Sequence, residues 1–347
     1  MLTRIVENGE AVFLLFSDEC GQVIDADSIE FIHLRATSML ESGRDYPQQT
    51  RDIFLKDDLE QLVRLAIRED LGRGMDLTTI AVVPPGLPAR AHIIARQPGV
   101  VAGVDLLPWI EQTLQASIEL SLHISDGTEF EKGACLATLN GDARDVLTCE
   151  RTFLNFLGRL CGIASWTAEH VRLIADFPAR LYDTRKTTPG WRRLEKYAVA
   201  CGGGRNHRLG LYDAVLIKDN HLACHARLTG RLLSPSEAIR HARAFLAEQP
   251  DAPSDAIVEI EVDSLEQLDD ALPANPDIVL LDNMSTDQLR DAVGRRNRVN
   301  ASVQLEASGG VRLNTLRAIA ETGVDRISVG ALTHSAINLD LGLDWEF

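Results

Sequence analysis

The feature that most constrains the fold is a regular alternation of short apolar strands and helical segments between residues 180 and 330. Segments of five or six residues read as strands at 180–184, 214–218, 257–262, 278–282, 303–307 and 326–330. The segments SLEQLDDAL, STDQLRDAVGRR and TLRAIAETG lie between the later strands, and each begins near a Ser or Thr that can cap a helix. This alternation predicts a parallel sheet.

Polar residues or glycines end almost every predicted strand, and their spacing is regular. Glu261, Asp282, Glu306 and Gly330 follow one another at intervals of 21, 24 and 24 residues, about the length of one short βα unit. In a βα barrel the carboxyl ends of all strands face one mouth, whereas a doubly wound sheet gathers such residues at a single switch point. The pattern therefore favours a barrel or partial barrel.

A chain of 347 residues predicts about two domains. Residues 58–165 are interpreted as an N-terminal α+β domain, with a helix from Leu59, antiparallel strands turned at Asn-Gly and Asp-Gly pairs, and a long helix that breaks near Gly162. Residues 166–335 form the predicted catalytic barrel, and the tail 336–347 is expected to join the α+β domain. Residues 1–57 are an extension whose role the sequence leaves open.

Composition excludes several classes of protein. The formal net charge of −16 and a pI near 5.0 argue against general nucleic-acid binding. No segment approaches the length of about 18 apolar residues that a membrane span needs. The six cysteines lack the spacing of a zinc site, which favours thiols in a reducing compartment. The expected location is the cytoplasm.

Against this acidic total, residues 181–221 carry eight Lys and Arg residues and only four Asp and Glu residues. Concentrated cations beside a Gly202-Gly203-Gly204 turn indicate a pocket for a small, multiply anionic ligand. We interpret the turn as a mobile one that lets His207 and Arg208 approach the ligand. The alternative is a solvated basic loop, which the neighbouring apolar run at 214–217 disfavours.

The predicted mouth combines cations and carboxylates. Cations there are Arg185, Lys186, Arg208 and Lys218, and guanidinium groups bind planar oxyanions bidentately. Glu261 and Asp282 lie opposite and suit Mg²⁺, which prefers one or two carboxylates with water and phosphate, or could stabilise a cationic transition state. An internal salt-bridge network across the barrel is the structural alternative.

Two glycine turns follow the last predicted strands. Ser308-Gly309-Gly310 comes after the strand that ends near Glu306, and Gly330-Ala331 follows the next strand. Successive glycine turns at these positions are the usual phosphate-binding elements of a βα barrel. They indicate a phosphorylated substrate.

These residues lie in long, ordered motifs that resemble the quinolinate phosphoribosyltransferase family over residues 58–347. The motifs are EDLGRGMDLTT, ERTFLN, DTRKTTPGWRRLEKYAVACGGGRNHRLGLYDAVLIKDNH, EVDSLEQ, LLDNM, EASGG and SVGALTHS. The resemblance implies phosphoribosyl transfer from phosphoribosyl pyrophosphate to quinolinate with Mg²⁺, which gives nicotinate mononucleotide, pyrophosphate and CO₂ in NAD biosynthesis. It also implies an open, seven-stranded βα barrel, an N-terminal α+β domain and a homodimer.

Roles for individual residues follow from the same resemblance. Arg151 would enter the site of the other subunit and help to hold quinolinate. Thr184, Arg185, Lys186, His207, Arg208 and Lys218 would bind the substrate's carboxylates and phosphates. Glu261 and Asp282 would face the ribose and its metal, with Lys186 or Lys218 as the proton donor. The 5′-phosphate would lie against Ser308, Gly309, Gly310, Val329, Gly330 and Ala331, with His334 nearby.

Two departures from the family pattern are the N-terminal extension and Met75, where a glycine is more usual. Two rival functions stay open on the sequence. One is a molybdenum-transport-associated paralogue of the same fold that acts on another ring acid, and the other is a regulator that binds a phosphosugar without catalysis. The sequence leaves the exact oligomer, the kinetic parameters and any regulation open.

Overall fold

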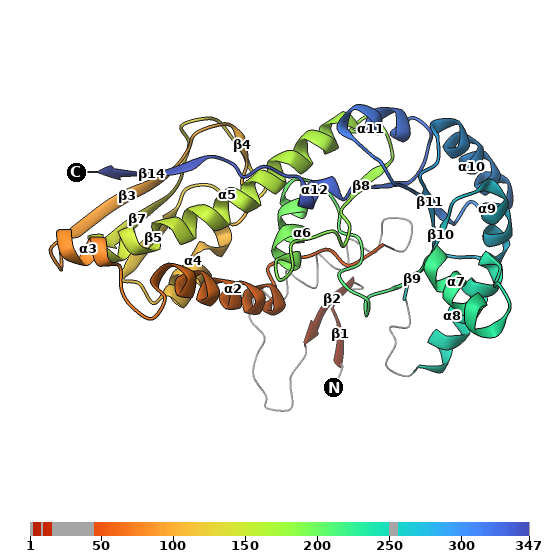
Figure 1. The fold of residues 1–347 in the computed structure, drawn as a ribbon, viewed down its shortest axis with the longest axis horizontal. Coiled ribbons are helices and arrows are strands. Elements are labelled where there is room, and N and C mark those ends of the chain that lie inside the picture. Colours follow the sequence, from red (N-terminus) through yellow and green to blue (C-terminus); the bar gives the residue numbers. More distant parts are fainter. Residues whose placement is uncertain (1–2, 8–9, 16–44, 250–255, 347) are drawn as a thin grey trace. The chain divides into compact units, whose positions relative to one another are not determined.

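The computed structural model describes residues 3–7, 10–15, 45–249 and 256–346 (Figure 1). The chain divides into two compact units, residues 1–44 and 45–347. In the first unit, β1 (Thr3–Glu7) pairs with β2 (Glu10–Leu15) in an antiparallel hairpin. The pattern of SIEFIHLRATSMLES suggests a short helix at residues 28–42, but this segment lies outside the described residues.

The second unit begins with an α+β layer. Its antiparallel sheet has the strand order β14-β3-β7-β5. The C-terminal strand pairs with β3 from Leu341 opposite Ala95 to Glu346 opposite Arg90. Bounds of the strands and helices of this layer are β3 (Pro88–Ala95), β4 (Gly99–Val100), β5 (Ile118–Leu122), β6 (Glu129–Phe130), β7 (Cys135–Asp142), β14 (Leu341–Glu346), α3 (Leu77–Val82), η1 (Val104–Leu106) and α4 (Leu107–Leu114).

The first helix of this unit, α2 (Ile53–Leu71), begins six residues before the predicted start at Leu59. Asp52 caps it by accepting a hydrogen bond from the backbone N–H of Leu55 at 2.8 Å. Ile53 and Phe54 are 76% and 60% exposed, but Leu55 is buried and extends the buried face of Leu59 and Val63 back into the first turn. The apolar face and the Asp52 cap both place the start before Leu59.

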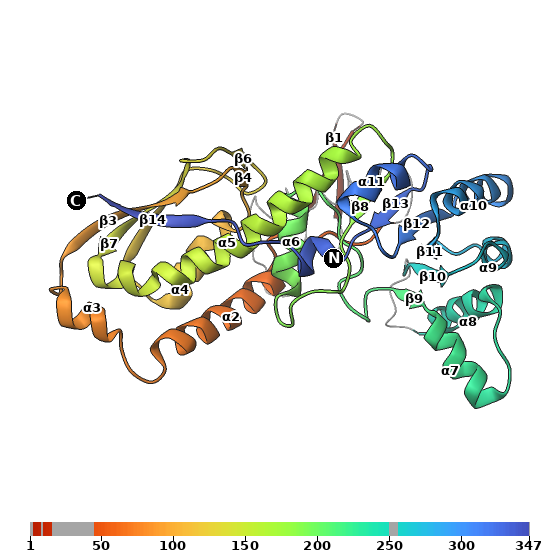
Figure 2. The same cartoon turned by 45° about the horizontal axis from the view of Figure 1, so that its top comes forward.

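The helix that joins the two layers of the unit, α5 (Ala143–Leu173), is 31 residues long and continuous (Figure 2). The predicted break near Gly162 is therefore wrong. A Cβ atom on Gly162 would lie 2.1 Å from the carbonyl oxygen of Ile337, so the glycine admits the returning C-terminal segment against the helix. A glycine inside a helical pattern marks close packing here, not a break.

The second layer is a parallel sheet with the strand order β8-β13-β12-β11-β10-β9. Its strands form an arc with helices on the outer side (Figure 1). The strands are β8 (Arg180–Tyr182), β9 (Val215–Ile217), β10 (Val258–Val262), β11 (Ile278–Asp282), β12 (Gln304–Ser308) and β13 (Arg326–Ser328). The helices are α6 (Arg192–Cys201), α7 (Asp219–Thr229), α8 (Pro235–Glu248), α9 (Leu265–Ala271), η2 (Leu272–Ala274), α10 (Thr286–Val299), α11 (Leu313–Ala320) and α12 (Ala331–His334).

The predicted parallel α/β architecture is confirmed, but this sheet has six strands where seven were expected. At the free side of β8, Arg205 forms an isolated parallel bridge with Tyr182. The backbone N–H of Arg205 donates to the carbonyl of Leu181 at 2.8 Å, and the carbonyl of Arg205 accepts from the backbone N–H of Asp183 at 3.0 Å. The segment 205–207 therefore follows the edge of the sheet without forming a strand of its own.

The glycine run that precedes this segment is packed closely against α5. A Cβ on Gly202 would lie 2.4 Å from the carbonyl oxygen of Ala164, and one on Gly204 would lie 2.7 Å from the side chain of Thr167. The glycine run therefore allows its backbone to approach α5 closely. The sequence alone suggested a mobile turn and did not predict this packing.

Candidate active site

The cations of the predicted mouth include two neighbouring arginines. Arg185 follows β8, and Arg208 follows the segment 205–207. Arg208 is 5% exposed, and its Nη1 donates to the carbonyl of Ala214 at 3.1 Å. Within the described residues, the buried Nε atoms of Arg185 and Arg208 have no hydrogen-bond partner. Burial lowers the pKa of Arg208, and the charge of Arg185 lowers it further. Two neighbouring guanidinium groups with free donors have the chemistry to bind an anion.

A fully buried ion pair fixes the backbone that carries Arg208. Asp183 accepts from Lys196 Nζ, from the backbone N–H of His207 at 2.9 Å and from Asn206 Nδ2 at 2.7 Å. Lys196 Nζ also donates to the carbonyl of His207 at 2.8 Å. Burial raises the pKa of Asp183 and lowers that of Lys196, and the attraction between the two opposes both shifts. Nothing in the sequence pattern predicts a role for either charge.

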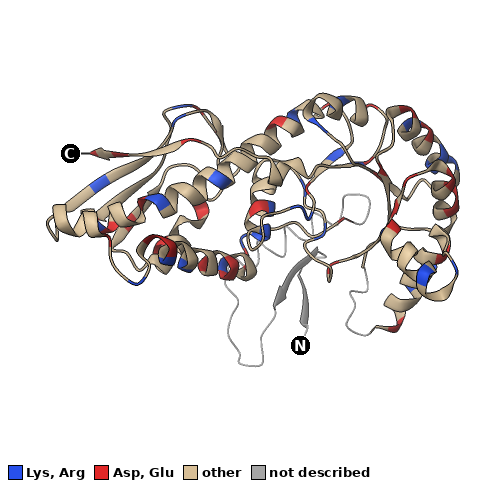
Figure 3. Cartoon of the chain, in the orientation of Figure 1, with Lys and Arg blue, Asp and Glu red and all other residues tan. Residues whose placement is uncertain are grey.

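The predicted carboxylates lie on neighbouring strands. Lys218 Nζ pairs with the carboxylate of Glu261, and the side chains of the two residues are 43% and 15% exposed. Asp282 ends the next strand, β11, and one of its oxygens accepts from Asn283 Nδ2 at 2.8 Å. Charged residues of both signs occur along the inner side of the arc of strands (Figure 3). The structure thus combines a cation and two carboxylates at the ends of consecutive strands.

The glycine turns meet residues from other strand ends. Gly309 and Gly310 have φ angles of 89° and 61°, and a Cβ on Gly309 would lie 2.3 Å from Asn283 Oδ1. A Cβ on Gly330 would lie 2.9 Å from Lys186 Cδ and 3.3 Å from His334 Nε2. The first turn therefore lies beside the end of β11, and the second lies beside Lys186.

Replacement of Gly309 by alanine is expected to lower the free energy of unfolding by about 1–3 kcal/mol, because the left-handed backbone and the contact with Asn283 both oppose a side chain. Gly294 in α10 is the control, since no atom lies within 4 Å of its added Cβ and its φ is helical. Alanine there is expected to be neutral or stabilising by up to about 1 kcal/mol. Urea denaturation measures both changes, and equal stability of the two variants would contradict this explanation.

The remaining predicted residues have simple local roles. Thr184 Oγ1 accepts from the backbone N–H of Lys186 at 3.0 Å, and the backbone N–H of Val329 donates to the carbonyl of Tyr182 at 2.9 Å. Ser308 ends β12, and Ala331 begins α12. The hydrogen bonds of Thr184 and Val329 thus help to fix the segments that follow β8 and β13.

Arg151 is set apart from this group. It lies on α5, its side chain is 69% exposed, and it pairs with Glu150 at 3.2 Å. Among the described residues, no hydrogen bond or ion pair joins it to the parallel sheet. The single chain therefore presents Arg151 to the outside of the molecule.

A buried charged layer, which the sequence pattern does not reveal as a unit, lies beneath the strand ends. Glu259 and Glu306 precede Glu261 and Ser308 by two residues on their strands, so each shares a face with its partner. Arg326 donates to Glu306 at 2.9 Å, and His207 Nε2 lies 3.2 Å from Glu259 and 3.5 Å from Glu306. This layer corresponds to the internal salt-bridge network considered as an alternative, but it lies below the site and does not replace it.

Two sets of residues could hold a metal ion. His207, Glu259 and Glu306 have donor atoms within 4.8 Å of one another, but an imidazole and an arginine-paired carboxylate are a poor match for Mg²⁺. Asp282 is half-buried, and its second oxygen has no hydrogen-bond partner among the described residues. An accessible carboxylate of this kind beside a glycine turn suits Mg²⁺ with water and phosphate oxygens.

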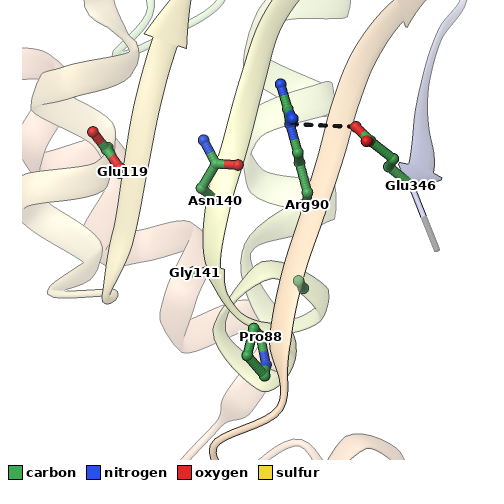
Figure 4. Close-up of a pocket in the computed structure, with 7 residues that line it drawn as sticks. Pro88, Arg90, Glu119, Asn140, Gly141 and Glu346 are labelled. Atoms are coloured by element: carbon green, nitrogen blue, oxygen red, sulfur yellow. Dashed lines mark ion pairs between the residues drawn. The ribbon is translucent and has the colours of Figure 1, made fainter.

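An open pocket elsewhere holds none of these residues. It lies on the antiparallel sheet and is lined by Pro88, Ala89, Arg90, Glu119, Asn140, Gly141 and Glu346 (Figure 4). Arg90 and Glu346 face one another across neighbouring strands, with Nε and the carboxylate 3.3 Å apart. This internal ion pair leaves the pocket without the concentrated cations of the parallel layer.

Comparison with known families covers most of the chain. Residues 76–161 match the quinolinate phosphoribosyl transferase N-terminal domain, and residues 163–344 match the C-terminal domain of the same family. The two matches meet inside α5, the helix that joins the two layers.

Individual relatives agree in sequence and in structure. Nicotinate-nucleotide pyrophosphorylase (carboxylating) of Mycobacterium leprae is 43% identical over 83% of this chain and 97% of its own length. A mitochondrial quinolinate phosphoribosyltransferase (decarboxylating) of Nicotiana tabacum is 35% identical over 82% of both chains. The structure of nicotinate-nucleotide pyrophosphorylase from Francisella tularensis, 36% identical, aligns with a TM-score of 0.77 over 87% of this chain and all of its own.

Proposed function

The chain belongs to the quinolinate phosphoribosyltransferase family, and from this premise we infer the reaction, the site residues and the assembly. The chain catalyses transfer of a phosphoribosyl group from phosphoribosyl pyrophosphate to quinolinate with decarboxylation, a step of NAD biosynthesis. The observation that carries the site assignment is that the neighbouring side chains of Arg185 and Arg208 each have a buried Nε atom without a hydrogen-bond partner. They match a rigid substrate with two adjacent carboxylates.

Quinolinate is proposed to lie against Arg185, Arg208 and Lys218, with Thr184 and Lys186 at the border of the site and His207 in the buried layer beneath it. Phosphoribosyl pyrophosphate is proposed to place its 5′-phosphate at the turns Ser308-Gly309-Gly310 and Val329-Gly330-Ala331, beside His334. The left-handed glycines and the contact between Gly330 and Lys186 support this placement, since backbone amides and a lysine bind phosphate.

The chemistry then follows from charge. As pyrophosphate departs, positive charge develops on the ribose, and Glu261 and Asp282 stabilise it electrostatically. The pyridine nitrogen forms the new C–N bond and becomes cationic. The electron pair of the adjacent C–CO₂⁻ bond then moves onto the ring carbon as CO₂ leaves, and that carbon takes a proton. Lys186 and Lys218 are the candidate proton donors, and Lys218 lies in contact with Glu261.

Mg²⁺ is proposed to bind at Asp282, with Glu261 as a second contact through water. When bound, the metal would neutralise charge on the departing pyrophosphate. The accessible oxygen of Asp282 supports this assignment.

Turnover of quinolinate and phosphoribosyl pyrophosphate by the purified protein, followed as nicotinate mononucleotide, tests the function. Full activity in excess EDTA would contradict the metal assignment.

The parallel sheet is proposed to be an open barrel whose seventh position is filled by residues 205–207. The bridge between Arg205 and Tyr182 supports this.

A cytoplasmic location is also proposed. Its support is that Cys135, Cys149, Cys161, Cys201 and Cys224 are free thiols, as expected in a reducing compartment. No helix in the described part of the chain is long and apolar enough to cross a membrane.

A homodimer is proposed, with Arg151 entering the partner's site. Arg151 lies one turn after Thr148, whose hydroxyl contacts Asp76 at the start of α3 at 3.4 Å. On α3, Leu77 and Val82 are 76% and 75% exposed. An outward-facing arginine beside exposed apolar side chains is consistent with an interface.

Heterodimers provide a specific test of this arrangement. Arg151→Ala and Lys218→Ala are each expected to be inactive alone. A heterodimer of the two has one site with both residues intact, so an exchanged mixture should recover about one quarter of wild-type activity. Mixing two batches of Lys218→Ala is the control and should recover none. If subunits exchange but activity does not return, Arg151 does not act in the partner's site.

A further inference from the structure

The segment Asp45–Thr50 precedes α2 and packs against residues 205–207. Gln48 Oε1 accepts from the backbone N–H of Asn206 at 2.8 Å, and Gln48 Nε2 donates to its carbonyl at 3.4 Å. The backbone N–H of Gln49 donates to Asn206 Oδ1 at 2.7 Å. Arg205 is hydrogen-bonded to the edge of β8. Residues 205–207 therefore lie between β8 and the segment Asp45–Thr50 and are hydrogen-bonded to both.

Tyr46 extends from this segment into the buried charged layer. It is 3% exposed and belongs to an apolar cluster with Ala214, Ile257 and Ile278. Its ring stacks on the ring of His207 with centroids 4.5 Å apart and planes 27° apart. Its hydroxyl donates to Glu259. The guanidinium of Arg326 lies 5.1 Å from the centre of the Tyr46 ring.

These contacts constrain the His207 ring on every polar atom. Nδ1 accepts from the backbone N–H of Arg208 at 2.8 Å, which assigns the ring proton to Nε2. Nε2 faces Glu259, so the imidazole and the Tyr46 hydroxyl both donate to that carboxylate. Burial alone would raise the pKa of Glu259, but His207, Tyr46 and Arg326 hold it below its ordinary value. The ring of His207 thus links Tyr46 to the backbone of Arg208.

We propose that Tyr46 is a positioning residue for the dicarboxylate subsite, acting through the His207 ring to fix the direction of Arg208. The proposal rests on the proposed function, because it takes Arg208 as a ligand of quinolinate. It gives a role to a residue outside both segments that match the family domains, which begin at residue 76. Tyr46 itself is 3% exposed and does not contact the substrate.

Steady-state kinetics with both substrates varied tests the proposal. Tyr46→Phe keeps the stacked ring but loses the hydroxyl, and we expect KM for quinolinate to rise about tenfold. Tyr46→Ala loses both contacts, and we expect a rise of about a hundredfold. Gln48→Ala, which leaves the ring untouched, should raise it a few fold. In each variant KM for phosphoribosyl pyrophosphate should stay within about twofold of wild type, because the glycine turns are unchanged.

Tyr212→Phe is the matched control, since Tyr212 follows Arg208 by four residues but is 70% exposed. It should behave as wild type. Calorimetric titration of quinolinate into each folded variant should show the same order of affinities as KM. If Tyr46→Ala does not fold, Tyr46→Phe decides. Wild-type KM for quinolinate in Tyr46→Phe, or parallel changes in both KM values, would overturn the proposal. An inactive wild-type protein would instead overturn the proposed function.

Discussion

Arg208→Ala is expected to lower kcat/KM for quinolinate by about a thousandfold, equivalent to ~4 kcal/mol. Arg208 is almost fully buried, and burial together with Arg185 lowers its pKa, so the site already bears the cost of holding two cations close together. Binding of a dicarboxylate repays that cost. Removal of one guanidinium loses its hydrogen bonds to a carboxylate that has been taken out of water.

A second substitution at Arg208 that keeps the positive charge, and a control at an exposed arginine, identify the cause of this loss. Arg208→Lys keeps the charge but loses the planar fork, so it should recover less than a tenth of wild-type kcat/KM. Arg227→Ala, on the exposed side of α7, is the control and should have no effect. Isothermal titration of quinolinate should show the same order. Retention of wild-type affinity by Arg208→Ala would remove this residue from the substrate site.

Lys196→Met is expected to lower the free energy of unfolding by about 3–5 kcal/mol at neutral pH. Lys196 and Asp183 are both fully buried, so the variant leaves a carboxylate without its counter-charge. Burial raises the pKa of Asp183, and the folded variant therefore takes up a proton more readily than the unfolded chain. A group whose pKa is higher in the folded state stabilises at low pH and loses that contribution as pH rises. The deficit relative to wild type should shrink as pH falls toward the ordinary range of an aspartate.

Chemical denaturation across pH measures both effects. Asp183→Asn combined with Lys196→Met should recover part of the lost stability, because the uncompensated charge is gone. Lys132→Met, at an exposed position, is the control and should change stability by less than about 0.5 kcal/mol. A deficit of equal size at all pH values would show that lost packing, not the buried charge, is responsible.

The sequence could predict the strand ends because their logic is local. An apolar run followed by a polar residue marks the carboxyl end of a parallel strand, and such ends lie at one edge. Glu261, Asp282 and the glycine turns were placed in this way, and the structure puts them at the ends of β10, β11, β12 and β13. The family, the activity and the parallel α/β fold are confirmed by the comparisons.

Other features depend on contacts between distant residues, which periodicity cannot show. Tyr46 meets His207 across 161 positions of sequence, and nothing near Tyr46 marks it as buried. The sequence shows Arg326 only as the first residue of a strand, and its pairing with Glu306 appears only in the structure. The helix break predicted at Gly162 failed for the same reason, since the segment that packs there is at Ile337.

This chain is expected to join quinolinate, and not another ring acid, to the phosphoribosyl group. The most direct measurement supplies phosphoribosyl pyrophosphate and Mg²⁺ with quinolinate, carrying isotopic carbon in the carboxylate beside the ring nitrogen, or with nicotinate in a parallel reaction. We predict one labelled CO₂ and one pyrophosphate for each nicotinate mononucleotide formed from quinolinate, and no turnover with nicotinate. Product from nicotinate or another ring acid, with none from quinolinate, would contradict this expectation.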